Sequence, residues 1–213
     1  MVKHVPLRRI PRQARGQRRM DAILDAAERV FAEVGYEAAT TNAIAARAGT
    51  AIGSLYQYFP NKEAILRALA DRFLDQLRGV LDVALDDAAA LADAPLESLV
   101  DRILDPVLAV RAARAGILDL YFRAGRPGGE VAQAAHGLID EIVARLDAIV
   151  AAREPWPDPE PRRLRVRIVV EVVRALLPLT APGGVPRPEV IAELKRVVRA
   201  YMAAIRDEVT GNP

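Results

Sequence analysis

Polar and aromatic side chains gather between Thr40 and Glu63 in a pattern that suits contact with DNA. The segment reads TTNAIAARAGTAIGSLYQYFPNKE. This pattern predicts two short helices joined by a turn at Gly49, which is the organisation of a helix-turn-helix. Such a motif places its second helix in the major groove of duplex DNA. The segment therefore predicts DNA binding.

Five residues of this segment have chemistry suited to that contact. Gln57 carries the one amide on the predicted second helix, which could pair with adenine through two hydrogen bonds. Ser54 could reach a phosphate or a base edge, and Gly53 lets the helix lie close to the DNA backbone. Ile52 suits contact with a thymine methyl group. Thr40 offers a hydroxyl and a helix N-terminus to a phosphate.

The charge distribution supports a cationic N-terminal module. Residues 1–70 hold 11 Lys and Arg against 6 Asp and Glu, whereas residues 71–213 hold 19 against 22. The first 20 residues contain seven basic side chains and no acidic one. This asymmetry is typical of a small DNA-binding part attached to a near-neutral body. We interpret residues 1–15, broken by Pro6 and Pro11, as a flexible basic arm.

Composition limits the other chemistry that the chain could perform. It has no cysteine, so disulfides, thiolate metal sites and cysteine nucleophiles are excluded. It has only two histidines, His4 and His136, which leaves almost no material for histidine-based metal or triad chemistry. We predict no catalytic residue, no metal site and no cofactor. No apolar run is long enough for a membrane span, and the basic N-terminus lacks a signal-peptide core, which favours the cytoplasm.

Apolar spacing predicts an all-α fold. A first amphipathic helix covers about residues 17–34 and stops at Gly35. The helices of the motif follow, one capped by Thr40 and one over residues 51–58, with Leu55 and Phe59 in their core. Asn61 caps a long fourth helix. Later helices are expected at 95–115, where Pro106 could kink or divide the run, and at 116–124, 130–153, 162–177 and 189–208.

The last two predicted helices have wide apolar faces that favour a four-helix dimer interface. The apolar positions of 189–208 step by three and four, and 162–177 carries paired valines and leucines. The alternative is that both helices pack on their own domain. The expected interface residues are Val169, Val172, Val173, Leu176, Ile191, Leu194, Val198, Tyr201 and Ile205.

Residues 17–66 closely resemble the TetR family of one-component bacterial repressors. The matching positions are Gly35-Tyr36, Thr40, Ile44-Ala45, Ala48-Gly49, Gly53-Ser54-Leu55-Tyr56, Phe59 and Lys62-Glu63. The remainder of the chain matches only in being helical and of suitable length. The resemblance implies an N-terminal three-helix DNA-binding domain, here 16–62, and a C-terminal ligand-binding and dimerisation domain, here 63–213.

The resemblance also implies phosphate contacts by Tyr56, Tyr58 and Lys62. With these, the expected DNA-binding set is Thr40, Thr41, Thr50, Ile52, Gly53, Ser54, Tyr56, Gln57, Tyr58 and Lys62. Two positions depart from the family pattern. Ala51 stands where serine usually caps the recognition helix, unless Thr50 caps it, and Ile52 stands where lysine or arginine is common. Arg8, Arg9, Arg12 and Arg15 of the arm could compensate on phosphates or in the minor groove.

Family members typically bind a small molecule among their central helices, which implies an inducer as a partner besides operator DNA and a second copy of the chain. No membrane partner is expected. Inward residues of the middle helices are the candidates for the pocket. They are Leu104, Leu108, Tyr121, Phe122, Arg123, His136 and Ile139. Arg123 beside two aromatic residues would suit an acidic ligand.

Two other functions compete with a ligand-responsive repressor. An enzyme would need a nucleophile with a base, or a metal cluster, and the sequence shows neither. A helical protein-interaction module that has lost DNA binding would fit the departures at Ala51 and Ile52.

Overall fold

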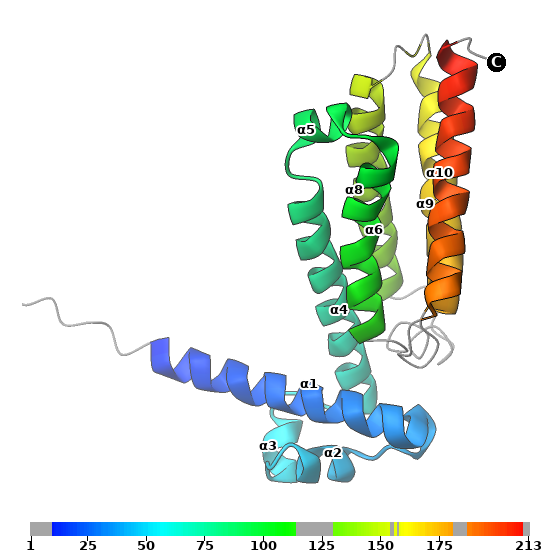
Figure 1. Cartoon of the computed structure of the whole chain (residues 1–213). Coiled ribbons are helices and arrows are strands. Elements are labelled where there is room, and N and C mark those ends of the chain that lie inside the picture. The colour runs from blue at the N-terminus through cyan, green and yellow to red at the C-terminus, as the bar shows by residue number, and fades with distance from the viewer. Residues whose placement is uncertain (1–9, 114–129, 154–155, 157, 181–186, 211–213) are drawn as a thin grey trace, which may run out of the picture. The chain divides into compact units, whose positions relative to one another are not determined.

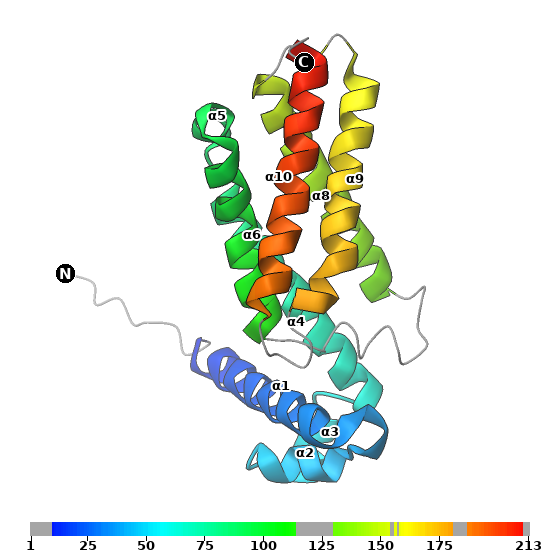
Figure 2. The ribbon, with the colours of Figure 1, turned by 45° about the vertical axis from the view of Figure 1, so that its right-hand side comes forward.

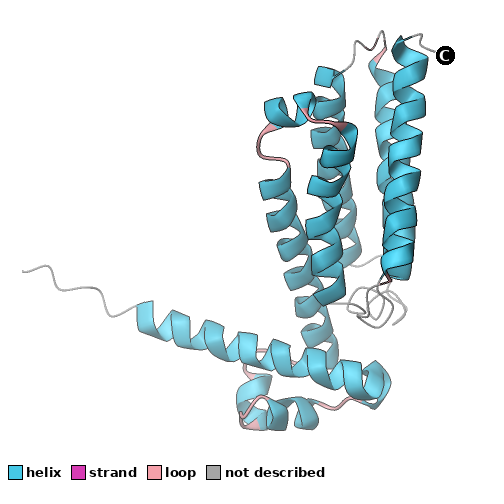
Figure 3. Ribbon diagram, in the orientation of Figure 1, coloured by secondary structure: helices cyan, strands magenta, loops and turns pink. Residues whose placement is uncertain are grey.

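The computed structural model describes residues 10–113, 130–153, 156, 158–180 and 187–210. These residues form helices joined by loops and turns, with no strand among them (Figure 3). The fold is all-α, as predicted. The helices are α1 (Ile10–Ala38), α2 (Thr41–Arg47), α3 (Ile52–Tyr56), α4 (Lys62–Ala84), α5 (Ala88–Asp93), α6 (Leu96–Ala113), α8 (Glu130–Arg153), α9 (Pro159–Thr180) and α10 (Pro188–Thr210) (Figure 1).

The chain divides into two compact units, residues 1–70 and 71–213. Helix α4 begins in the first unit and ends in the second. The boundary expected from the sequence lay eight residues earlier, between 62 and 63. None of the described helices is long and apolar enough to cross a membrane.

In the first unit, α1 lies across α2 and α3 (Figures 1 and 2). The apolar positions of α1 recur every three or four residues, which places them on one face of the helix. That face meets the apolar side chains of α2, α3 and the start of α4. The residues with no measurable exposure in this core are Ile23, Ala27, Ile44, Leu55, Ile65 and Ala70.

Helix α1 begins earlier than the sequence predicted. Residues 10–15, assigned to the flexible arm, are helical from Ile10. Pro11 lies in the first turn, where the missing N–H breaks no intrahelical bond, so a proline there does not prevent a helix. The interruption at Gly35 is confirmed, because this residue adopts φ 78° and breaks the helical geometry before one last turn.

In the second unit, α9 and α10 run side by side in opposite directions (Figures 1 and 2). Their inner faces pack on α6 through a cluster that includes Leu104, Leu108, Leu194 and Val198. A second cluster joins α4, α5, α6 and α8 around Leu91, which is fully buried. The second unit thus buries two adjoining groups of aliphatic side chains.

The helix bounds of this unit agree with the sequence at most positions. Helix α8 has the predicted bounds, while α9 extends three residues further than expected at each end. Pro106 lies inside α6 without dividing it. The short helix expected at 116–124 lies outside the described residues.

Ion pairs between charged side chains join neighbouring helices of this unit. The guanidinium of Arg162 on α9 donates to both carboxylate oxygens of Asp147 on α8, at 2.7 and 3.0 Å. These hydrogen bonds hold the pKa of Asp147 below its usual value, against the opposing effect of burial. The ammonium of Lys195 on α10 forms ion pairs with the carboxylates of Asp101 and Asp105 on α6, at 2.9 and 2.5 Å.

Candidate DNA-binding interface and ligand cavity

Helix α2 begins at a side-chain cap. The Thr40 hydroxyl oxygen accepts a hydrogen bond from the backbone N–H of Ala43 at 3.1 Å, which confirms the predicted N-cap. The oxygen accepts in this contact, so the O–H of the same hydroxyl remains available as a donor. Because Thr40 is exposed, the start of α2 offers donors on the surface of the first unit.

The turn between α2 and α3 depends on Gly49. This glycine has φ 62°, a left-handed conformation in which a side chain would be strained. Ala51 is the N-cap of helix α3 and no side chain caps this helix, so Thr50 does not replace the missing serine. Helix α3 has five residues, Ile52–Tyr56, and is shorter than the predicted 51–58.

The buried side of α3 fixes which side chains face outward. Leu55 is fully buried and Phe59 is 4% exposed, which confirms both as core residues. Gly53 and Gln57, four residues apart on the other side, are exposed. Ile52, Ser54 and Thr50 are half-buried at its margins. Helix α3 therefore presents a small, uncharged face whose one amide is Gln57.

Two hydroxyl groups meet where α3 ends and α2 begins. The Tyr56 hydroxyl lies 3.1 Å from the Thr41 hydroxyl, and the two form a hydrogen bond. Tyr56 is half exposed, so this pair lies at the surface beside Thr40. The structure thus brings together three hydroxyl-bearing residues of the predicted site, Thr40, Thr41 and Tyr56.

Tyr58 has a different environment from Tyr56. A Cβ atom at Gly16 would lie 3.8 Å from the Tyr58 hydroxyl oxygen, so this side chain reaches α1 at Gly16. Tyr58 is 37% exposed. Of the arm's arginines, Arg15 is exposed on α1, whereas Arg8, Arg9 and the side chain of Arg12 lie outside the described residues.

The Lys62 side chain caps the end of α1. Its ammonium donates to the carbonyl oxygen of Tyr36 at 2.6 Å and to that of Glu37 at 3.1 Å. It also lies 4.3 Å from the centroid of the Tyr36 ring, within cation–π range. Two of its three N–H donors are used in this way, which leaves one for another acceptor.

A second brace in the first unit was missed in the sequence. Arg47 on α2 forms a two-point ion pair with Glu33 on α1. Hydrogen bonding from Arg47 lowers the pKa of Glu33, and the pair is exposed to solvent. Residues fourteen positions apart with opposite charge occur too often in any sequence for this pairing to stand out.

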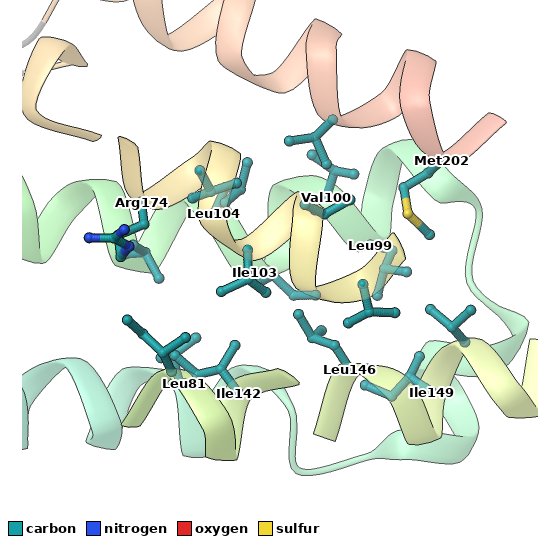
Figure 4. A pocket seen from close by; sticks show the side chains of 18 of the residues that line it. Leu81, Leu99, Val100, Ile103, Leu104, Ile142, Leu146, Ile149, Arg174 and Met202 are labelled. Carbon is teal, nitrogen blue, oxygen red and sulfur yellow. The ribbon is translucent and has the colours of Figure 1, made fainter. Parts of the chain in front are cut away.

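The second unit encloses a cavity of about 170 Å³ between α4, α6, α8, α9 and α10 (Figure 4). Its lining consists of leucine, isoleucine and valine side chains with one methionine, Met202, and one charged residue, Arg174. Of the predicted pocket residues, Leu104 and Ile139 line it. Leu108 packs in the α6–α10 cluster instead, and His136 is exposed on α8. Tyr121, Phe122 and Arg123 lie outside the described residues.

Part of the predicted dimer interface is buried within its own unit. Leu194, Val198 and Ile205 are buried inside their own unit, and Val169, Val173, Leu176 and Ile191 pack against the same core. The buried Leu194, Val198 and Ile205 of α10 are therefore not available to a second copy, whereas Val169, Val173, Leu176 and Ile191 keep part of their surface exposed. Val172 and Tyr201 are only half-buried. The large exposed apolar residues of the two helices are Leu164, Ile168, Leu179 and Val197.

Comparison with known proteins agrees with the geometry of both units. Residues 23–69 match the family model for bacterial regulatory proteins of the tetR family, and residues 95–202 match that for the tetracyclin repressor-like C-terminal domain. A Mycobacterium tuberculosis protein named as an uncharacterized HTH-type transcriptional regulator is 31% identical over 175 residues, 81% of each chain.

Two further relatives span most of the chain. The A-factor receptor protein of Streptomyces griseus is 28% identical, over 91% of this chain and 73% of its own length. The crystal structure of a TetR-family transcriptional regulator from Streptomyces coelicolor has a TM-score of 0.60 at 27% identity, covering 89% of this chain and 98% of that one.

Proposed function

Because the chain belongs to the TetR family, and is therefore a DNA-binding transcriptional regulator and not an enzyme, we propose that it is a homodimeric repressor released from its operator by a small molecule. The alternative of an interaction module without DNA binding is set aside on the same grounds. Because the proposed protein binds operator DNA, we expect it to act in the cytoplasm. The exposed face of α3, fixed from behind by buried Leu55, is the observation that carries the proposal.

The α3 face reads the bases in this proposal. Gln57 is exposed and uncharged, so it would discriminate adenine rather than neutralise phosphate. Gly53, on the same face, lets the helix approach the groove closely. Ile52 and Ser54 at the margins would contact a thymine methyl group and the groove edge, with Thr50 beside them.

Phosphate contacts surround that face. The paired hydroxyls of Thr41 and Tyr56, and the Thr40 hydroxyl at the start of α2, would donate to phosphate. Lys62 would use its third N–H in the same way while the other two hold α1. Tyr58 and Arg15 would contact the backbone beside α1, and the basic residues before it would add sequence-independent affinity.

The exposed side of α9 supports the proposed dimer. Leu164, Ile168 and Leu179 recur at spacings that place them on one stripe of the helix, and Val172 lies on the same stripe. Val197 exposes a further apolar side chain on neighbouring α10. A second copy would cover this stripe. Two recognition helices held about 34–36 Å apart would then enter successive major grooves of a pseudo-palindromic site.

The cavity of the second unit is the site proposed for the inducer. One relative, the A-factor receptor protein, is a receptor by name. To release the operator, the ligand must bind the non-operator conformation more tightly than the operator-bound one, since equal affinity for both changes nothing.

A mobility-shift assay with DNA flanking its own gene tests the proposal. The wild-type chain should shift this DNA, with affinity that falls steeply as salt rises. Gln57→Ala should cost about 1–3 kcal/mol on the operator and relax preference at one base pair. Gln133→Ala, which removes an exposed amide from α8, is the matched control. Equal behaviour of the two variants, or no shift even at low salt, would contradict the proposal.

A further inference from the structure

A second, smaller pocket adjoins the aliphatic cavity. It measures about 30 Å³ and lies between the ends of α6, α8 and α10 and the loop residue Trp156. Leu96, Val150 and Met202 line both hollows, so the pocket opens beside one end of the cavity. In Figure 4, Met202 and Ile149 mark this end of the view, and Arg174 lies at the opposite end.

The polar side chains that line the small pocket all carry hydrogen-bond donors and no acceptor. They are those of Arg153, Trp156 and Arg206, and neither a guanidinium nor an indole can accept a hydrogen bond. The remaining lining side chains are aliphatic or thioether groups. Such a pocket selects an occupant that supplies acceptors.

The indole N–H of Trp156 lacks an acceptor. Its Nε1 atom is buried and makes no hydrogen bond within the described part of the chain. The Arg165 guanidinium lies 5.5 Å from the centroid of the indole ring and holds the ring in place. A buried donor without an acceptor is costly, so a ligand that supplies the acceptor gains affinity.

The charge of the pocket favours an anion. Among the described residues, Arg153 donates to the backbone carbonyl oxygens of Leu91 and Ala94, each at 2.7 Å, rather than to a carboxylate. No acidic side chain of the described residues forms an ion pair with Arg153. Arg206 adds a second guanidinium, with Asp207 at 3.4 Å. A pocket of this size admits a small headgroup, since one water needs only about 10–15 Å³.

The adjoining cavity defines the rest of the ligand. Its lining on α9 runs from Val166 to Leu177, about 16 Å of helix. An apolar cavity of about 150 Å³ holds one benzene molecule, so 170 Å³ admits a short alkyl chain of similar volume. Because the lining is aliphatic or thioether apart from Arg174 at one end, the cavity favours a hydrocarbon chain.

We propose that the effector is an aliphatic carboxylate whose chain fills the cavity and whose headgroup accepts from Trp156 Nε1 between Arg153 and Arg206. The assignment names the ligand class of the proposed inducer site and so rests on that function. Arg174 at the other end is less suited, because its Nε already donates to Glu171 at 2.6 Å.

Titration of the full chain with octanoate and with octylamine tests the headgroup. The two probes share a chain and carry opposite charges at neutral pH. Trp156 is the only tryptophan, so its emission reports on the pocket directly. Octanoate should bind and shift the emission, while octylamine should bind at least tenfold more weakly. Equal affinities, or no binding of octanoate at millimolar concentration, would overturn the assignment.

Calorimetry on variants locates the two ends of the ligand. Trp156→Phe keeps a ring beneath Arg165 but removes the donor, and should weaken octanoate binding about tenfold. Arg196→Gln, an exposed charge on α10, is its control. Val173→Phe should fill the cavity and abolish binding, with the exposed Val83→Phe as control for an added ring. Unchanged binding in Trp156→Phe, or a loss on Arg174→Gln in its place, would reject the headgroup site.

Operator binding is measured separately, so the two proposals fail independently. If octanoate binds as expected but the chain never binds duplex DNA, the ligand assignment stands and the repressor proposal falls. If the chain binds its operator and ignores octanoate, only the ligand assignment falls.

Discussion

The Lys62 ammonium lies 2.6 Å from the carbonyl oxygen of Tyr36 and 4.3 Å from the centroid of the same residue's ring. One side chain at the start of α4 thus binds both the backbone and the aromatic face at the end of α1. A carbonyl at a helix C-terminus carries partial negative charge, which favours a cation there. The lysine that the family resemblance implies for phosphate also stabilises the fold of its own unit.

We expect Lys62→Met to lower the free energy of unfolding by about 1–2 kcal/mol, because it removes two charged hydrogen bonds and a cation–π contact. It should also weaken binding to all DNA sequences alike and reduce the salt dependence by about one phosphate contact. Chemical denaturation and mobility shifts at several salt concentrations measure the two effects. Arg29→Met, an exposed charge on α1, is the control. If the variant loses DNA affinity but keeps its stability, Lys62 contacts phosphate but does not stabilise the fold.

Helix α3 lacks a capping side chain, and restoring one should stabilise it. Ala51→Ser places a hydroxyl at the N-cap, where the structure has no side-chain hydrogen bond. Serine in place of alanine at such a position contributes about 1 kcal/mol. Thermal unfolding should show a higher midpoint. Ala46→Ser, on the exposed side of α2, should not raise it. If the two substitutions act alike, the missing cap does not limit stability.

Thr40 and Lys62 show what the sequence could and could not predict. Caps such as Thr40 are local, so the start of α2 was predicted correctly from a few neighbouring residues. The Lys62 contacts join residues about 25 positions apart, and no local pattern specifies them. Likewise, the periodic seam of α10 showed that one face is buried. It could not show that α6 covers that face instead of a second copy.

Stability should fall with acid through Asp147. Hydrogen bonds from Arg162 lower the pKa of this carboxyl in the folded chain, so the unfolded chain binds its proton more readily. The contribution is complete above the unfolded pKa of about 3.9 and is lost as the pH falls through the lower folded value. Asp147→Asn should cost about 3 kcal/mol at neutral pH, since it leaves Arg162 without its buried partner.

Denaturant titrations between neutral and acid pH measure this dependence. The Asp147→Asn variant should lose less stability on acidification than the wild-type chain, because one linked proton is gone. Asp140→Asn is the comparison, as it removes an exposed carboxylate from the same helix. An identical acid response in Asp147→Asn and wild type would rule out Asp147 as a source of the dependence.

The stripe on α9 should decide the oligomeric state. Ile168 is 39% exposed and lies between Leu164 and Leu179, so Ile168→Glu would put a charge inside the interface that we propose. Burying an unpaired carboxylate costs several kcal/mol, enough to dissociate a dimer at micromolar concentration. Sedimentation should show dimers for the wild type and monomers for the variant. Val83→Glu, on an exposed valine of α4, should stay dimeric. Since Ile168 does not belong to the buried core, the monomeric variant should keep its helical content. If the variant unfolds instead, Ile168 belongs to that core and not to a dimer interface.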